Sequence, residues 1–253
     1  MKWGALTAGA LMLGALAAWA LLMPGPEHEI AAYTTSFEGR TRSQIHNATL
    51  AAGGINNMVL MPGDTFSFLK AVGDWTADRG YVKAPVSHDG ELVRSWGGGV
   101  CQVSTTLYNA ALLAGLQIVE RHPHHWPARY APLGRDAAVA YSDIDLKFRN
   151  NLPEPIRIVC STDGESLRFR ILSRYMPKQR AIVETVVESV TKPGEVIQDR
   201  ASGNGRWRLV NRGHPGFCVA TYRRLESSRG ARLELVSVDR YPEMHRIVRI
   251  AER

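Results

Sequence analysis

Cys101 is the residue of this sequence whose position best suits covalent chemistry. It follows a run of three glycines and opens the stretch CQVSTTLYNAALLAG, whose apolar spacing predicts a helix that ends at Gly115. Backbone N–H groups and the helix dipole at a first helical turn lower a thiol pKa and favour the nucleophilic thiolate. The alternative interpretation is a small buried residue in a tight turn.

The residues around Cys101 could hold a substrate. Gly97, Gly98 and Gly99 would let a substrate carbonyl approach a backbone that carries no side chains. The N–H group of Cys101 with that of a neighbour, or the side-chain amide of Gln102, could hold a developing oxyanion. The candidate substrate-binding residues are therefore Gly97, Gly98, Gly99, Gln102, Ser104 and Thr105.

A cysteine nucleophile needs a base and a group that orients the base. His122, His124 and His125 cluster in the loop RHPHHWP, about 20 residues after Cys101, and two aspartates, Asp143 and Asp145, follow. The chain order Cys, His, Asp occurs in papain-like and transglutaminase-like thiol enzymes. A triad is defined by geometry, however, so these histidines could equally belong to a surface loop that packs on Trp126.

The elements that must position these residues point to an α+β fold. Alternating apolar residues predict strands over 144–148, 156–160 and 167–171, and the link 161–165 makes the last two a hairpin. The Cys-bearing helix would pack on this antiparallel sheet. From residue 174 onward, strand-like runs alternate with glycine turns, which predicts a separate small all-β domain.

Charge divides the chain at the same place. The 253 residues carry a net charge of +7, and residues 174–253 hold 16 basic and 9 acidic side chains, so the remainder is neutral. This basic region could contact anionic polymers, and its arginines and Trp207 allow nucleic acid. The composition excludes a disordered acidic tail, a collagen-like chain and a polytopic membrane protein.

The N-terminus predicts a location outside the cytoplasm. Residues 3–23 form one uncharged apolar run behind Lys2, long enough to span a bilayer, and Pro24 and Pro26 end it. We expect an uncleaved signal anchor over residues 1–26; the alternative is a signal peptide cleaved after Ala18-Trp19-Ala20, which would leave a secreted protein. Domains would then cover residues 27–173 and 174–253. Outside the cytoplasm, wall polymer or lipid headgroups are the expected anionic partners and nucleic acid is not.

The other cysteines suggest structural roles. Cys160 and Cys218 lie in predicted strands, and a disulfide between them would tie the two domains together and leave Cys101 free. The spacing of the three cysteines does not suit a zinc site, and no HExxH, CxxC or phosphate-loop motif is present. We therefore predict neither a metal nor a cofactor.

Several motifs together make the chain resemble the VanW family. They are PGDTFSF (62–68), GY (80–81), GGGVCQVSTTLYNAALLAGL (97–116), ERHPHH (120–125), YAPLGRDAAVAY (130–141) and DLKFRNN (145–151). The tail, with Gly194-Glu195, the GHPG of residues 213–216 and the closing DRYPEMHRIVRI, resembles a divergent G5 domain, a small β module associated with wall glycan.

This resemblance implies a function. Members of the family are associated with L,D-transpeptidation of peptidoglycan through the cysteine of the motif. Carried over, it implies Cys101 as nucleophile, His124 as base and Asp145 as the group that orients the base, with Asp136 as a substitute for Asp145. The substrate would be a peptidoglycan stem peptide. The alternative is a non-catalytic envelope protein whose pocket binds stem peptide or glycan, with Cys101 structural.

Overall fold

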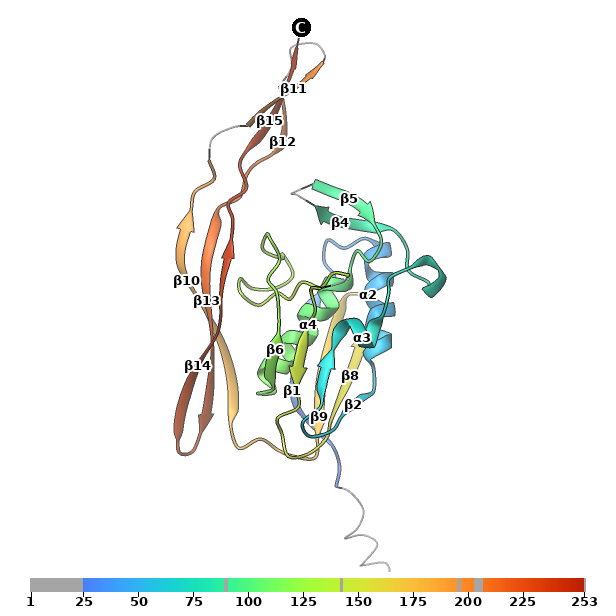
Figure 1. Ribbon diagram of the computed structural model, residues 1–253, viewed down its shortest axis with the longest axis vertical. Coiled ribbons are helices and arrows are strands. Elements are labelled where there is room, and N and C mark those ends of the chain that lie inside the picture. The colour runs from blue at the N-terminus through green and yellow to red at the C-terminus, as the bar shows by residue number, and fades with distance from the viewer. Residues whose placement is uncertain (1–24, 89–90, 142, 195–196, 203–206, 253) are drawn as a thin grey trace, which may run out of the picture.

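A computed structural model describes residues 25–252, apart from 89–90, 142, 195–196 and 203–206 (Figure 1). The apolar run of residues 3–23, predicted to be an anchor, lies outside the described residues. Within the described part of the chain, no helix is long and apolar enough to span a bilayer. The fold class is α+β, as predicted, with several antiparallel sheets and few helices.

A four-stranded antiparallel sheet forms the base of the N-terminal region. Its order is β1 (His28–Ser36), β9 (Ser166–Ser173), β8 (Ile156–Thr162) and β2 (Met58–Leu60). The β8–β9 pair is the predicted hairpin. Alternate residues of these two strands, Ile156, Ile158, Leu167, Phe169 and Ile171, are fully buried, because one face of the sheet packs against helices.

The Cys-bearing helix α4 (Val100–Leu113) runs through the middle of the molecule. It packs against β1 and β9 of this sheet, against helix α2 (Arg42–Ile55) and against a strand of the C-terminal region (Figure 1). Residues 102–112 are all buried, so over this stretch the helix has no solvent-exposed face, unlike a surface helix. Helix α2 begins at Thr41, whose side chain forms a capping box with Gln44.

Several smaller elements complete the N-terminal region. They are β3 (Thr65–Ser67), α3 (Phe68–Val72), the 3₁₀ turn η1 (Ala77–Arg79), the β4–β5 hairpin (Ala84–His88 and Glu91–Ser95), β6 (Gln117–Glu120) and β7 (Lys147–Arg149). Strands β3, β7 and β6 pair antiparallel in that order. The long loop that joins β6 to β7 carries the predicted histidines.

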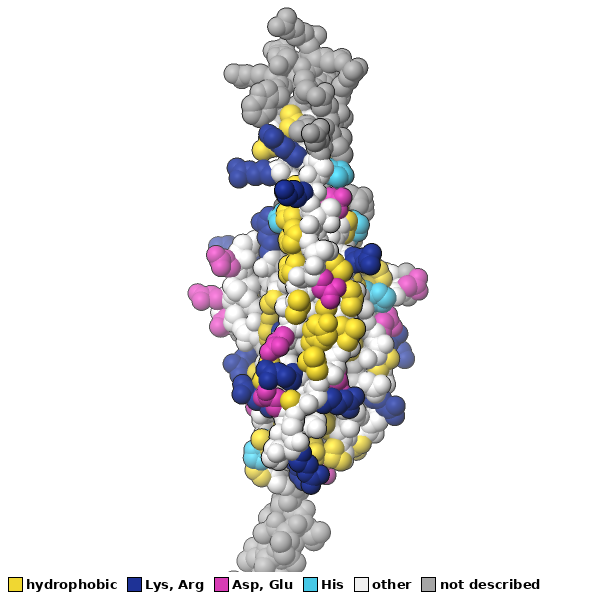
Figure 2. Space-filling view, turned by 90° about the vertical axis from the view of Figure 1, so that its left-hand side faces the viewer, with side chains coloured by type: hydrophobic (Ala, Val, Ile, Leu, Met, Phe, Trp, Pro, Cys, Tyr) yellow, Lys and Arg dark blue, Asp and Glu magenta, His cyan; other side chains and the backbone are white. Residues whose placement is uncertain are grey.

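The C-terminal region is all β, as its sequence predicts. Long strands β10 (Arg180–Thr191), β13 (Gly216–Ser227) and β14 (Gly230–Tyr241) form one antiparallel sheet. Strands β11 (Ile197–Ser202), β15 (Ile247–Glu252) and β12 (Trp207–Asn211) form a second. The first sheet lies alongside the N-terminal region, and apolar side chains gather on its outer face (Figure 2).

Candidate active site

Cys101 is the second residue of α4, as the sequence predicts, and the residue is half-buried. Its Sγ lies 3.4 Å from Val139 O. In the turn before it, the N–H of Val100 donates to Gly97 O (2.9 Å) and the N–H of Gln102 donates to Gly99 O (3.2 Å). Among the described residues, the N–H of Cys101 has no acceptor. This backbone donor is therefore available to an oxygen that approaches the sulfur.

Tight packing requires glycine at each position of the run 97–99. A Cβ on Gly99 would lie 2.2 Å from the backbone oxygen of Gln44, and Gly99 has a φ of 107°. A Cβ on Gly98 would lie 2.6 Å from the backbone oxygen of Pro85, and one on Gly97 would lie 2.6 Å from the Trp75 ring. The three glycines thus press the start of α4 against its neighbours and fix the position of Cys101.

His124 and Asp136 form the clearest polar pair of the site. Asp136 Oδ2 lies 2.6 Å from His124 Nδ1 and also accepts the His124 backbone N–H at 2.7 Å. The two residues meet because the N–H of Ala138 donates to His122 O and pairs the two loop segments. Since Nδ1 faces Asp136, Nε2 is the nitrogen left for Cys101.

Cys101 and His124 each shift the pKa of the other. Burial raises the pKa of the Cys101 thiol, but the hydrogen bond and charge of His124 outweigh it, and the net pKa lies below the ordinary thiol value. Burial lowers the pKa of His124, but its hydrogen bonds with Asp136 and Cys101 raise it to about 10. Both shifts favour a thiolate–imidazolium pair at neutral pH.

Asp136 stays ionised because His124, Arg121 and Tyr241, from different parts of the fold, all contact its carboxylate. Burial raises the pKa of this carboxyl, but the hydrogen bond and charge of His124 and the charge of Arg121 bring it below its ordinary value. Arg121 Nη2 lies 3.2 Å from Asp136 Oδ1, and the Tyr241 hydroxyl donates to the same oxygen at 2.5 Å. Arg121 also pairs with Asp239 at 2.6 Å.

The C-terminal sheet therefore takes part in the site. Tyr241 and Asp239 both lie on β14, and the Tyr241 hydroxyl also accepts the N–H of Gly134 at 3.0 Å. Thr221 on β13 donates its hydroxyl to Gly134 O at 3.1 Å. The spacing of these residues in the sequence gives no signal of this contact, because Tyr241 and Asp136 are 105 positions apart.

Three of the predicted substrate-binding side chains hold the protein together instead. Gln102 is 1% exposed, and its amide N–H groups donate to Thr35 Oγ1 and Ser36 O, so it has no free donor for an oxyanion. Ser104 and Thr105 are fully buried and bond the backbone of Ala137. The expectation that these side chains touch substrate does not fit their burial. Ser104 and Thr105 fix the segment that carries Asp136, whereas Gln102 bonds the end of β1.

Asp145 lies elsewhere in the fold. Its Oδ2 accepts the Ser67 hydroxyl at 2.6 Å, and its Oδ1 accepts the N–H groups of Leu69 and Leu146 at 3.0 and 2.8 Å. These bonds satisfy the first turn of α3 and attach it to β7. Asp136, which the sequence analysis held as the substitute, is the carboxylate on His124, and Asp145 has the geometry of a structural residue.

The remaining candidates lie outside this constellation. His122 Nε2 lies 3.1 Å from Glu120, and the His125 ring packs edge-on against Trp126. Cys101, Cys160 and Cys218 are all free thiols, so the alternative of a Cys160–Cys218 disulfide is not formed. No group of three or more His, Cys, Asp or Glu side chains within the described residues is arranged to hold a metal ion.

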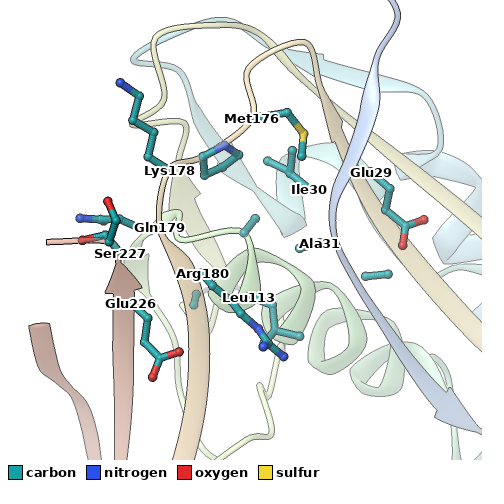
Figure 3. A pocket seen from close by; sticks show the side chains of 15 residues that line it. Glu29, Ile30, Ala31, Leu113, Met176, Lys178, Gln179, Arg180, Glu226 and Ser227 are labelled. Carbon is teal, nitrogen blue, oxygen red and sulfur yellow. The ribbon is translucent and has the colours of Figure 1, made fainter. Parts of the chain in front are cut away.

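A cavity lies apart from Cys101. It encloses about 740 Å³ between β1, the carboxyl end of α4 and the segment 176–181 (Figure 3). Leu113 and Ala114 line it, at the opposite end of the helix from the thiol. Its lining contains no cysteine or histidine.

Comparison with known proteins identifies relatives for the region that carries Cys101. Residues 43–172 match the family model described as VanW like protein. Protein YoaR of Bacillus subtilis (strain 168) is 42% identical over 145 residues, which cover 57% of this chain and 48% of YoaR. Vancomycin B-type resistance protein VanW of Enterococcus faecalis (strain ATCC 700802 / V583) is 30% identical over 141 residues, 54% of this chain and 51% of VanW. The matched region thus spans about half the length of these relatives.

The C-terminal region has a weaker counterpart. The crystal structure of HP0197-G5 covers 29% of this chain and 97% of that chain, with 19% sequence identity and a TM-score of 0.17. A likeness at this level does not assign a domain family. The G5-like character of residues 174–253 stays a prediction.

Proposed function

This chain belongs to the VanW-like protein family, and we propose that it is a cysteine acyltransferase of the L,D-transpeptidase type that acts on peptidoglycan stem peptides. The observation that carries the proposal is the alignment of Cys101, His124 and Asp136. A half-buried thiol of lowered pKa at a helix start faces an imidazole whose other nitrogen is held by a buried carboxylate. Thiol acyl transfer uses these three groups: a thiolate nucleophile, a base and a group that orients the base.

The first half-reaction would acylate Cys101. The thiolate adds to the peptide carbonyl carbon that precedes a D-amino acid, and the carbonyl electrons move onto oxygen. The free N–H of Cys101 stabilises this oxyanion. The C–N bond then breaks, His124 Nε2 gives its proton to the departing amine, and a thioester remains on Cys101.

The second half-reaction would transfer the acyl group. The amine of a second stem peptide attacks the thioester carbonyl and loses a proton to His124, whose imidazole became neutral in the first step. The C–S bond breaks and the thiolate returns, paired again with the imidazolium. Asp136 keeps His124 oriented and compensates its charge in both steps.

The experiment is incubation of the purified protein with muropeptides, followed by intact-protein mass spectrometry and analysis of the products. We expect an acyl adduct on Cys101 and cross-linked dimers. Both should be lost in Cys101→Ala, whereas Cys160→Ala, which removes a thiol bonded to Ala52 O, should keep them. Normal cross-linking by Cys101→Ala would contradict the proposal.

The alternative function is non-catalytic binding of stem peptide or wall glycan. It predicts that Cys101→Ala binds muropeptide as the wild type does and that the wild type forms no adduct. The lowered pKa of the Cys101 thiol supports catalysis, because a structural cysteine gains nothing from a thiolate.

The location and the wider partners are also part of the proposal. We place the protein outside the cytoplasm, held by a single N-terminal anchor in residues 1–26. The excess of basic residues in 174–253 supports contact with anionic wall polymer or lipid headgroups. Fractionation of cells that express the tagged full-length chain, with protease access to intact cells, tests both points.

A further inference from the structure

Arg40 lies beside Cys101 and is held in place by two contacts. Its Nε donates to Gln102 Oε1 at 3.0 Å, and its guanidinium carbon lies 4.5 Å above the centre of the Tyr130 ring. The Tyr130 ring lies edge-on to the His124 ring, with the two ring centres 6.5 Å apart, so Arg40 and Tyr130 stand close to the Cys101–His124 pair. Both residues also interact electrostatically with Cys101. The guanidinium is therefore fixed next to the nucleophile by a hydrogen bond and a stacked ring.

The outer end of this guanidinium is unpaired. Neither Nη atom of Arg40 has an acceptor among the described residues, and no described carboxylate forms an ion pair with it. Arg121, the other arginine near the site, meets both Asp136 and Asp239. Removal of a charge from water is unfavourable unless the charge is paired, so the half-buried guanidinium of Arg40 favours an anionic partner.

We propose that Arg40 binds a carboxylate of the acyl-donor substrate, and that this carboxylate is the α-carboxylate of the residue released when Cys101 is acylated. The proposal rests on the proposed function of the site. A guanidinium offers two parallel N–H groups that match the two oxygens of a carboxylate. It would make the site prefer a peptide bond one residue from a free C-terminus.

Alkylation tests Arg40 without the natural substrate. Iodoacetate carries a carboxylate and iodoacetamide is its neutral counterpart, so the ratio of their rates at Cys101 reports local positive charge. We expect Arg40→Gln to lower the iodoacetate-to-iodoacetamide ratio by about tenfold or more, with the iodoacetamide rate nearly unchanged. Arg40→Lys should retain part of the ratio.

Arg42→Gln is the matched control, since Arg42 is an exposed arginine two positions away. It should leave the ratio unchanged. An unchanged ratio in Arg40→Gln would overturn the proposal, whatever the enzyme does with peptides. The iodoacetamide rate, measured in the same samples, shows that each variant keeps the site folded.

Peptide donors then identify the source of the carboxylate. Donor peptides ending in a free acid or an amide are compared, as are donors carrying a side-chain acid or its amide next to the attacked bond. We expect the wild type to prefer the C-terminal acid by about tenfold or more and Arg40→Gln to lose this preference. A preference tied to the side-chain acid, or one that survives Arg40→Gln, would overturn the assignment. No acylation of any donor would instead contradict the proposed function.

Discussion

At the scale of single residues, the carboxylate on His124 decides how Cys101 ionises. Asp136 holds Nδ1 at 2.6 Å and is itself kept charged by Arg121 and Tyr241. Asp145 is equally buried but bonds Ser67 and two backbone N–H groups. Substitution of Asp136 therefore tests the role of the carboxylate on His124, and substitution of Asp145 is the matched control.

We predict that Asp136→Asn moves the pH dependence of Cys101 alkylation to higher pH. Loss of the carboxylate lowers the pKa of His124, so the imidazolium no longer favours the thiolate and the thiol pKa rises. The measurement is the pH–rate profile with iodoacetamide. Asp145→Asn should lower stability and leave the midpoint of that profile unchanged; a shift of equal size in both variants would contradict the assignment.

The same histidine makes stability depend on pH. The pKa of His124 is about 10 in the folded protein and near 6.5 when the chain is unfolded. A raised pKa means that its contribution to stability is complete below about pH 6.5 and is lost as the pH rises through about 10. We expect the difference in Tm between wild type and His124→Gln to shrink from pH 6 to pH 10, as thermal unfolding at each pH would show. A difference that grew over this range would contradict the pKa.

At the scale of elements, helix α4 depends on the turn that precedes it. Gly97 and Gly99 both have positive φ, and the backbone of Gln44 on α2 lies against Gly99. The glycines of α2 are different, because a Cβ on Gly53 would meet open space. Gly99 and Gly53 both lie near a helix end, yet the packing requires glycine at position 99 and leaves room for a Cβ at position 53.

We predict that Gly99→Ala lowers the free energy of unfolding by more than about 1 kcal/mol, through strain at positive φ and contact with Gln44. Gly53→Ala should instead stabilise by about 0.5–1 kcal/mol, because alanine favours a helix. Urea titration of both variants measures the two effects. Equal destabilisation by both substitutions would show that the close packing of Gly99 is not what matters.

At the scale of the whole molecule, the β10–β13–β14 sheet completes the site that α4 and its loop begin. Tyr241 and Asp239 reach Asp136 and Arg121 from β14, and all four side chains are nearly or fully buried. The basic C-terminal region therefore also contributes side chains to the candidate site. It supplies Tyr241, which bonds the orienting carboxylate, and Asp239, which pairs with the Arg121 that holds this carboxylate.

We predict that Tyr241→Phe lowers the free energy of unfolding by about 1.5–3 kcal/mol, the range for a hydrogen bond to a charged group. It should also raise the midpoint of the Cys101 alkylation profile, because Asp136 loses a bond that favours its charge. Denaturant unfolding and alkylation provide the two readouts. Tyr222→Phe on the neighbouring strand β13 is the control, since its hydroxyl has no partner among the described residues.

Much of the local structure follows from the sequence alone. Apolar spacing and Gly115 predict the helix that the structure places at Val100–Leu113, and alternation with the link 161–165 predicts the β8–β9 hairpin. The glycine run places Cys101 in the first helical turn. These features depend on residues near each other in the chain, where periodicity and turn residues carry the information.

Only the tertiary structure decided which residues meet Cys101 and His124. Asp136 and Asp145 both follow the histidines, and the choice between them depends on the pairing of His122 with Ala138 and on buried bonds from Thr105 and Tyr241. Gln102 and Ser104 stand beside the thiol in sequence, yet the central position of α4 buries them in bonds to other segments. Residues that are neighbours in the chain can point to different sides of a helix. A contact between residues 105 positions apart, such as Tyr241 and Asp136, gives no signal in the spacing of the sequence. The residues of the site were therefore determined by tertiary packing.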